Sequence, residues 1–308
     1  MKGINSYHRS LLEAFYEEGY TRVKLTRDWY TWRIRPFLSF LEAEGIALAD
    51  TGPSEIKRHF ARLVDEGYSW STRNGSYTAL SVFFRWLVAR GLVERSPFDV
   101  EEIKRPRKTA RVQYLVEIEE LQKLFDTIRA EDSVLARRDY ALILLMFDTG
   151  LRRAEAASLK ISDIRMKQNL IVIRVAKNNN QRIVPCQTIT IDAVERWLEV
   201  HPTKDEGHLF VALRGKSYGK PLSGRRIHGI LASWLEKAGI EDSCRITPHS
   251  LRRAFATYFS DAGGDMFVLR DILGHKGIET TRLYVINTQK RIQLQHTKHS
   301  PVNLLDLR

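Results

Sequence analysis

Apolar residues between positions 21 and 98 recur at the three- and four-residue spacing of a helix surface. We predict three helices here, over residues 21–45, 53–67 and 71–91, each closed by a glycine. Pro36 falls inside the first of them and would kink or split it. This part of the chain is therefore predicted to be entirely helical.

Bulky aromatic residues lie on these predicted helices. Trp29 and Trp32 share the first helix with Phe37 and Phe40. Such rings could stack on nucleic acid bases, as they do in proteins that bind single strands. Their helical spacing is more typical of core packing, so we interpret them as core residues.

The chain becomes polar and basic after Ser96, and Pro106 disfavours a continuous helix across this stretch. We predict an extended linker over residues 105–112, between a domain of residues 1–104 and a second of residues 113–308. A charged run is commonly only solvated surface, but a basic run between two domains is well placed to lie along a phosphate backbone. The backbone-contact candidates are Lys104, Arg105, Arg107 and Lys108.

The rest of the chain mixes two periodicities. Residues 170–175 and 182–184 are rich in Ile and Val and flank a polar, asparagine-rich turn, which is typical of a β-hairpin. The fold class is therefore predicted as mainly α with a small β-sheet, a helical amino-terminal domain being followed by an α+β domain. Helices are predicted over residues 117–128, 137–148, 191–200, 223–238, 250–262 and 266–273.

The charge balance points to a polyanionic partner. Among 308 residues, 49 Lys and Arg face 37 Asp and Glu, which gives a net charge of +12 and a pI near 9.7. An excess of this size favours nucleic acid or an acidic membrane surface. Hydrophobic residues make up 43% and charged residues 28%, the profile of a soluble globular protein.

Several classes of protein are disfavoured. No apolar run approaches the roughly 18 residues of a membrane span. The polar sequence after Met1 does not resemble a secretory signal. Cys186 and Cys244 form neither a CxxC nor a zinc-type spacing, so we expect reduced thiols in a cytoplasmic protein.

If the partner is DNA, breaking a phosphodiester requires a nucleophile, cations around the phosphate and an acid for the departing oxygen. A metal-dependent route would use converging carboxylates. The acidic residues of the second domain form no recognisable ligand motif, so we predict no metal and no other cofactor. The remaining route uses fixed cations and a protein nucleophile.

Six residues fit that second route in order and spacing. Each alone is more often structural than catalytic, because arginines, histidines and tyrosines are common on protein surfaces. Successive steps of 25, 72, 3, 23 and 9 residues separate the members of the set. They are Arg152, Lys177, His249, Arg252, His275 and Tyr284.

The ordered set resembles the tyrosine recombinase, or phage integrase, family along nearly the whole chain. The similar motifs are TGLRRAE at 149–155, the lysine of the predicted hairpin, TPHSLRRAFAT at 247–257, LGH at 273–275 and the final tyrosine. The overall size resembles the Xer-like members. The resemblance implies a SAM-like, helical core-binding domain followed by a catalytic domain.

The resemblance also implies a role for each residue. Tyr284 would attack the scissile phosphorus and leave a 3′-phosphotyrosine and a free 5′-hydroxyl, with no metal or ATP. Arg152 and Arg252 would clamp the non-bridging oxygens, which bidentate guanidinium groups suit. Lys177 would protonate the departing 5′-oxygen.

Three further roles come from the same resemblance. His249 would assist proton transfer at the tyrosine, and His275 would donate a hydrogen bond to the phosphate. Glu155 would orient an arginine from outside the reacting shell.

The implied partner is double-stranded DNA with a specific recombination site, bound by a homo-tetramer on two such sites. The tail of about residues 286–308 would dock on a neighbouring subunit. We expect a prokaryotic cytoplasmic protein that is nucleoid-associated when bound to DNA, with no membrane partner. Integration, excision and dimer resolution of a chromosome or transposon all remain open, as does the need for an accessory protein or a second recombinase.

Four rival functions fit part of this pattern. A type IB topoisomerase uses similar groups but relaxes supercoils as a monomer, which would leave the helical domain and the oligomer-type tail unexplained. A DNA-binding protein without activity would be expected to lack a member of the set, and none is missing. A nuclease or a binder of membrane surfaces would explain the charge alone.

Overall fold

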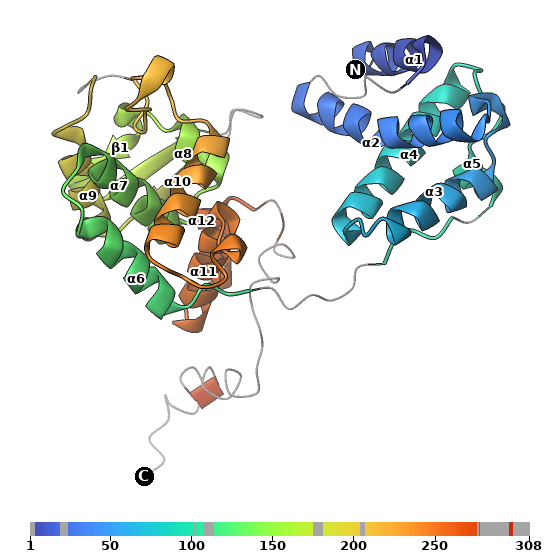
Figure 1. Ribbon diagram of the computed structural model, residues 1–308. Helices are drawn as coiled ribbons and strands as arrows, with labels where there is room; N and C mark the ends of the chain where they lie inside the picture. Colours follow the sequence, from blue (N-terminus) through green and yellow to red (C-terminus); the bar gives the residue numbers. More distant parts are fainter. Residues whose placement is uncertain are drawn as a thin grey trace. The chain divides into compact units, whose positions relative to one another are not determined.

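The chain divides into two compact units, residues 1–112 and 113–308, each with its own hydrophobic core (Figure 1). This computed structural model describes residues 4–18, 24–101, 103–107, 114–174, 181–203, 207–275, 277 and 296–297.

The first unit is helical in all its regular elements, as the apolar periodicity predicts. Its helices are α1 (Ser6–Glu17), α2 (Lys24–Glu44), α3 (Pro53–Asp65), α4 (Trp70–Ala89) and the short α5 (Pro97–Val100). Helix α1 adds to the predicted set and begins where the Asn5 side chain accepts a hydrogen bond from the His8 backbone N–H. Helix α2 continues unbroken through Pro36. Helix α4 is capped by Ser69 and begins one residue before its predicted start.

The core of this unit lies mainly between α2 and α4, which pack against each other. Ile34, Phe37 and Leu41 of α2 and Phe83 and Phe84 of α4 are fully buried in it. The interpretation of Phe37 as a core residue is confirmed.

Trp32 contradicts the core interpretation. Its side chain is 66% exposed, and Trp29 on the same helix is 37% exposed. Each residue turns a helix by about 100°, so Trp32 lies roughly 200° around the helix from the buried Ile34. The guanidinium of Arg33 lies over both indole rings, 5.5 Å and 5.0 Å from the ring centres of Trp29 and Trp32.

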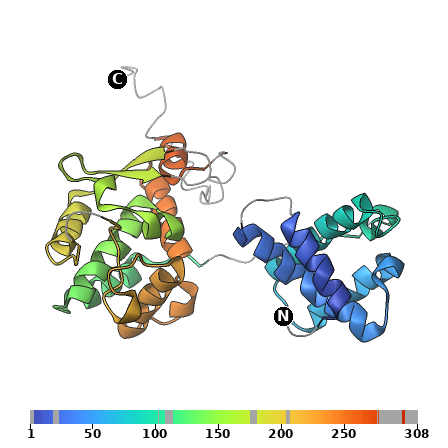
Figure 2. The ribbon, with the colours of Figure 1, turned by 90° about the horizontal axis from the view of Figure 1, so that it is seen from above.

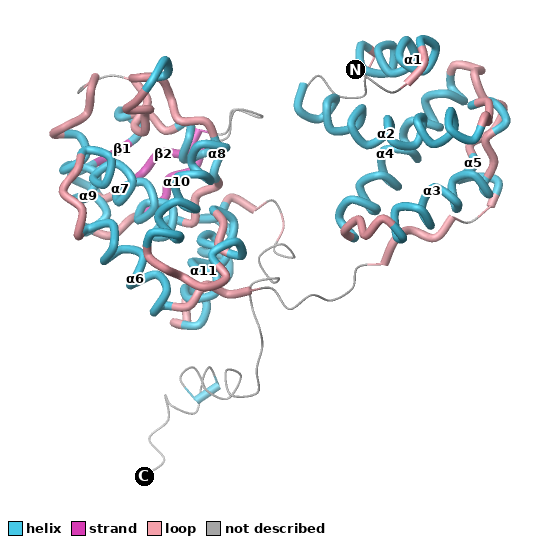
Figure 3. Tube along the Cα trace, in the orientation of Figure 1, coloured by secondary structure: helices cyan, strands magenta, loops and turns pink. Residues whose placement is uncertain are grey.

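The second unit is mainly helical with one small antiparallel sheet (Figure 3). The sheet has the order β1-β2-β3, and β3 pairs with β2 in a register that places Gln181 opposite Arg174. Its strands are β1 (Ile164–Arg165), β2 (Leu170–Arg174) and β3 (Gln181–Pro185). Its helices are α6 (Ile118–Arg129), α7 (Val134–Thr149), α8 (Arg153–Ser158), α9 (Thr188–Leu198), α10 (Gly224–Lys237), α11 (Pro248–Asp261) and α12 (Met266–Leu273).

Six of these helices and the two longer strands match the predicted elements to within three residues at each end. Strand β1 and the short helix α8 are additions. The fold class is confirmed: mainly α with a small β-sheet.

Helix α7 is the centre of the second unit, because α6, α9 and α11 all pack against it. Helix α12 packs against both α11 and β3, and Figure 2 shows its end beside the sheet. The carboxyl ends of α7 and α12 and the start of α8 come together, although α12 lies far from α7 and α8 in sequence.

In the stretches of chain that the structure describes, no helix combines the length and the apolar character that a bilayer crossing demands.

Candidate active site

The first segment of the site is the turn that leaves helix α7. Gly150 ends the helix in a left-handed conformation, with φ of 61°. A Cβ atom at this position would lie 2.6 Å from Cδ1 of Phe255 and 2.8 Å from Cδ2 of Leu273. Only glycine combines this backbone conformation with so close an approach of α11 and α12.

Arg252 reaches this turn from the first half of α11. Its Nη1 donates to the Gly150 carbonyl over 2.6 Å, and its Nη2 donates to the Leu273 carbonyl over 2.7 Å. The residue is only 2% exposed. Main-chain carbonyls accept well from a cation, so they stabilise a positive charge that burial alone would penalise.

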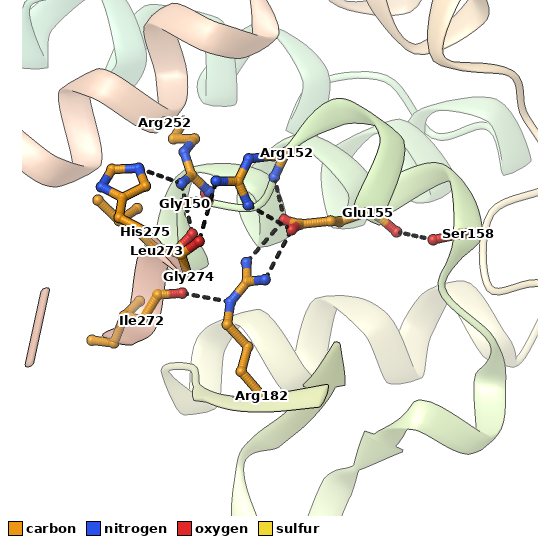
Figure 4. Close-up of polar contacts among 10 residues, drawn as sticks. All are labelled: Gly150, Arg152, Glu155, Ser158, Arg182, Arg252, Ile272, Leu273, Gly274 and His275. Carbon is orange, nitrogen blue, oxygen red and sulfur yellow. Dashed lines mark hydrogen bonds and ion pairs between the residues drawn. The ribbon is translucent and has the colours of Figure 1, made fainter. Parts of the chain in front are cut away.

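Arg152 lies on the solvent side of the same cluster. It is the N-cap residue of α8, and its side chain is 44% exposed. Its Nη2 lies 3.4 Å from the Gly274 carbonyl. The two predicted arginines are thus brought together, Arg252 buried and Arg152 open to solvent (Figure 4).

Glu155 is the acceptor that holds Arg152 in place. Its Oε2 accepts from the Arg152 backbone N–H over 2.8 Å, and its Oε1 accepts from Nη1 of the same residue over 2.9 Å. Burial raises the pKa of Glu155, whereas hydrogen bonds and charges from Arg182 and Arg152 lower it by a larger amount. The pKa of Glu155 therefore lies below its ordinary value. The carboxylate is therefore ionised and takes part in the charge balance of the site.

Arg182 was missed by the sequence interpretation and lies at the centre of the cluster. It donates from Nη1 and Nη2 to the two oxygens of Glu155, over 2.8 Å and 2.9 Å, and from Nε to the Ile272 carbonyl over 2.8 Å. On β3 it occupies the same face as the buried Val184, whereas Ile183 is exposed. An arginine on the inward face of a strand is a usable signal, but the sequence does not reveal which face is inward.

His275 follows the end of α12 and completes the described cluster. Its Nε2 lies 2.9 Å from Nη2 of Arg252. A guanidinium group can only donate, so Nε2 is the acceptor and the ring proton belongs on Nδ1. Burial and the charges of Arg252, Arg152 and Arg182, opposed by Glu155, lower the pKa of His275 to about 4. The ring is therefore neutral at physiological pH.

His249 lies one turn before Arg252 on α11, as the spacing predicts, and it is exposed. Partial desolvation of the ring by its neighbours and the positive charges of Arg252, Arg253 and Arg152 lower its pKa below the ordinary value. A neutral imidazole can accept a proton, which is the property that its predicted role requires.

Two members of the predicted set, Lys177 and Tyr284, lie outside the described residues, as does Lys108 of the linker. Lys104 and Arg107 are exposed. Arg105 is also exposed but contacts α4: its Nε donates to Oδ1 of Asn74 over 2.8 Å.

The described cluster is strongly positive, because three arginines surround one carboxylate. Three guanidinium charges and one carboxylate charge leave a net +2 with His275 neutral. An anion would be attracted to the open side, where Arg152 is exposed. Within the described part of the chain, acidic, histidine and cysteine side chains form no group able to hold a metal ion.

Comparison with known proteins identifies the family of this chain. Residues 115–291 match the model of the phage integrase family. Tyrosine recombinase XerA of Pyrococcus furiosus is 30% identical over 92% of this chain and 91% of its own. Tyrosine recombinase XerC of Halalkalibacterium halodurans is 28% identical over 88% of this chain and 90% of its own.

A solved structure shows the same fold over nearly the full length. The XerH site-specific recombinase bound to palindromic difH substrate is similar over 96% of this chain and 90% of its own, with a TM-score of 0.73 and 20% identity. The chain therefore belongs to the phage integrase family, and within it to the Xer-like tyrosine recombinases. It is a site-specific recombinase that acts on DNA, an enzyme that transfers DNA strands.

Proposed function

We propose that this recombinase cuts and rejoins DNA through a covalent bond to Tyr284. The phenol oxygen attacks the scissile phosphorus, the bond to the 5′-oxygen breaks, and a 3′-phosphotyrosine and a 5′-hydroxyl result. The linkage conserves the energy of the broken bond, so a 5′-hydroxyl of the same or another strand can reverse the step without ATP. The observation that supports this proposal is the convergence of Arg152, Arg252 and His275 at one positively charged surface.

The two arginines have different parts in this proposal. Arg152 is exposed and binds the non-bridging oxygens directly. Arg252 is buried, is held by the Gly150 and Leu273 carbonyls, and stabilises the negative charge of the phosphate from the protein side of the site. Because these cations are already oriented, they stabilise the developing phosphorane without reorganisation.

The remaining groups move protons or bind the phosphate. Free tyrosine has a pKa near 10, so Tyr284 needs a proton acceptor near neutral pH, and His249 supplies it. Lys177 protonates the departing 5′-oxygen. His275 donates a hydrogen bond to the phosphate from the one N–H that its neutral ring carries.

A covalent adduct on a denaturing gel is the direct test. A duplex selected by this protein from a library randomised within inverted-repeat arms is nicked beside the cleavage point, so that the cut strand diffuses away and the adduct accumulates. We expect an adduct in EDTA that Tyr284→Phe abolishes. The matched control is Tyr218→Phe, because that tyrosine is 61% exposed on a loop of the same unit. An adduct that persists in Tyr284→Phe would remove the proposed nucleophile.

The role of Lys177 has a chemical test of its own. Lys177→Ala should cleave the selected nicked duplex slowly, because the 5′-alkoxide leaves poorly without a proton. A duplex with sulfur in place of the bridging 5′-oxygen has a leaving group of pKa near that of a thiol, about 8.5, and needs no such proton. We expect sulfur to restore cleavage by Lys177→Ala. Slow cleavage of both duplexes contradicts the assignment.

We also propose that the partner is a specific duplex site and that a homo-tetramer assembles on two sites, with the tail of residues 286–308 docking on a neighbour. We propose a prokaryotic cytoplasmic location for the protein, at the nucleoid when it is bound to DNA. Light scattering of the protein with the selected duplex should give four chains and two duplexes. A complex that stays at one chain, and relaxes plasmids lacking the site, would favour a topoisomerase-like activity.

The basic residues after α5 are proposed as backbone contacts: Lys104, Arg105, Arg107 and Lys108. Arg105 is already oriented by Asn74 and lies with its guanidinium 5.7 Å from the ring centre of Tyr77. Binding should weaken with salt, and Arg107→Gln should lower the salt slope by about one unit, because each neutralised phosphate releases about 0.9 counterions. An unchanged slope removes Arg107 from this interface.

A further inference from the structure

Three segments of the site meet at one guanidinium group. The Nη atoms of Arg182 form a fork on the two oxygens of Glu155, at 2.8 Å and 2.9 Å, and its Nε donates to the Ile272 carbonyl at 2.8 Å (Figure 4). Arg182 therefore joins strand β3, the first turn of α8 and the last turn of α12. The same carboxylate also binds Arg152.

We propose that Arg182 is a positioning residue for strand cleavage. By occupying Glu155, it lets that carboxylate orient Arg152 without neutralising it. By holding Ile272, it fixes the end of α12 that carries His275. This inference rests on the proposed function, in which Arg152 and His275 bind the scissile phosphate.

The occupancy of Glu155 is the first step of the argument. Two carboxylate oxygens offer about four acceptor positions. Four hydrogen bonds fill them, two from Arg152 and two from Arg182. The second Nη atom of Arg152 is directed elsewhere, toward the Gly274 carbonyl at 3.4 Å.

Removal of Arg182 would change how Arg152 is held. Two acceptor positions of Glu155 would open beside a side chain that is 44% exposed and so has room to move. Arginine and carboxylate groups favour a bidentate pair, so Arg152 would turn onto Glu155 with both Nη atoms. Its charge would then be shared with the carboxylate and not with a DNA phosphate.

Arg182 itself is not placed to bind DNA. Its side chain is 13% exposed, and Nε, Nη1 and Nη2 each have a protein acceptor. Loss of this side chain should therefore affect the chemical step more than the affinity for DNA.

The approach of α12 to Arg182 depends on a glycine. Gly274 ends α12 with φ of 64°, and a Cβ atom there would lie 2.9 Å from Nη1 of Arg182 and 3.1 Å from its Cδ. Any other residue would press on the guanidinium. The LGH motif thus supplies His275 and also leaves room for Arg182.

The place of Arg182 on β3 adds a connection to the proposed general acid. Lys177 precedes Arg182 by five residues, and the described strand begins at Gln181. Arg182 therefore fixes, against Glu155 and α12, the strand into which the Lys177 segment leads.

Single-turnover cleavage of the selected nicked duplex, together with its dissociation constant, tests the role. Arg182→Gln should lower the cleavage rate of bound duplex about 10- to 100-fold, the scale of a misplacement of about 1 Å in an active site. The dissociation constant should change by less than about threefold, because Arg182 makes no phosphate contact.

The double variant separates positioning from general damage. In Glu155→Gln/Arg182→Gln the competing carboxylate is gone, so Arg152 is released. Cleavage should recover at least about fivefold over Arg182→Gln, a difference of roughly 1 kcal/mol in activation free energy. Unrelated structural damage would instead make the double variant worse than either single variant. If Arg182→Gln does not fold, Arg182→Lys and Glu155→Gln/Arg182→Lys are compared by the same criteria, because lysine cannot form the fork.

Arg174→Gln is the matched control. Arg174 lies on the neighbouring strand, opposite Gln181, and its exposed guanidinium pairs with Oδ1 of the buried Asp163 at 2.7 Å and not with the carboxylate of Glu155. The variant should cleave within about twofold of the wild-type rate, because the partner of Arg174 is Asp163 and not Glu155 or Ile272.

Three results would each overturn the role of Arg182. The first is a wild-type cleavage rate in Arg182→Gln, and the second is a lower rate that is fully explained by weaker DNA binding. The third is a double variant that cleaves no faster than Arg182→Gln. Tyr284→Phe, run beside them, keeps the two proposals apart. An adduct in Tyr284→Phe removes the proposed nucleophile, whereas its absence together with normal cleavage by Arg182→Gln overturns only the positioning role.

Discussion

We predict that Gly150→Ala lowers the free energy of unfolding for two separate reasons, backbone strain and steric overlap. The residue has φ of 61°, so an alanine would be held in the left-handed region at a cost of about 1–2 kcal/mol. Its Cβ would also lie 2.6 Å from Cδ1 of Phe255 and 2.8 Å from Cδ2 of Leu273. Overpacking of this kind costs typically about 1–3 kcal/mol.

Gly215→Ala isolates the first cost. Gly215 has φ of 67°, and nothing lies within 4 Å of a Cβ built there. We therefore expect Gly150→Ala to lose about 2–5 kcal/mol and Gly215→Ala only about 1–2 kcal/mol. The difference of about 1–3 kcal/mol is the steric part.

Differential scanning calorimetry of the full chain measures this difference. In a unit of this size, each 1 kcal/mol lowers the melting temperature by about 2–4 °C. Gly150→Ala should shift the transition of the unit of residues 113–308 at least about 2 °C further than Gly215→Ala does. The transition of residues 1–112 serves as an internal reference in the same scan.

Activity gives a second, independent measurement. The Gly150 carbonyl accepts from Nη1 of Arg252 over 2.6 Å, so a backbone shift at Gly150 displaces the buried guanidinium. At a temperature where both variants are folded, Gly150→Ala should cleave the selected nicked duplex more slowly than Gly215→Ala. The reasoning is refuted if the two variants melt together and cleave at the same rate.

Three further predictions concern protonation and a buried ion pair. The pKa of His275 is lowered to about 4. Nitrogen NMR of the DNA-free protein should therefore show a neutral ring with its proton on Nδ1 down to about pH 5. Titration of this ring near pH 6.5 would contradict the prediction. His59 is 2% exposed, neither ring nitrogen has a hydrogen-bond partner, and burial lowers its pKa to about 4. The unfolded chain takes up that proton first, so stability should fall by up to about 3 kcal/mol as pH drops from 6.5 to 4, and His59→Leu should remove this dependence. Arg138 and Asp139 form a buried ion pair at 2.6 Å. Arg138→Met leaves the carboxylate without its cation, so the free energy of unfolding in urea should fall by about 3–5 kcal/mol. A loss under about 1 kcal/mol would show that the hydrogen bond from Trp234 is sufficient for the Asp139 carboxylate.

The helices and strands were largely predictable because their signals are local. Apolar spacing, caps and terminal glycines act within a few residues, so α12 was predicted at its observed bounds and α7 to within three residues. Helix α8 was missed because six residues are too few for a periodic pattern.

The order of motifs along the sequence identified Arg152, Glu155, Arg252 and His275, and the structure brings these four together. It did not identify Arg182, because a lone arginine in a strand carries no local mark of the face it occupies. Likewise, the helical spacing of Trp32 is the same whether its face is buried or exposed, and only the packing of α2 against α4 decided that it is exposed.

The sequence by itself therefore determined the family and the two kinds of regular structure, and it predicted a set of site residues of which the structure brings four together. The tertiary structure decided which arginine is buried, which ring nitrogen of His275 accepts a hydrogen bond and which groups share the carboxylate of Glu155. The physical reason is range. Caps and periodicity depend on neighbours along the chain, whereas burial, charge balance and hydrogen-bond partners depend on elements that meet only after folding.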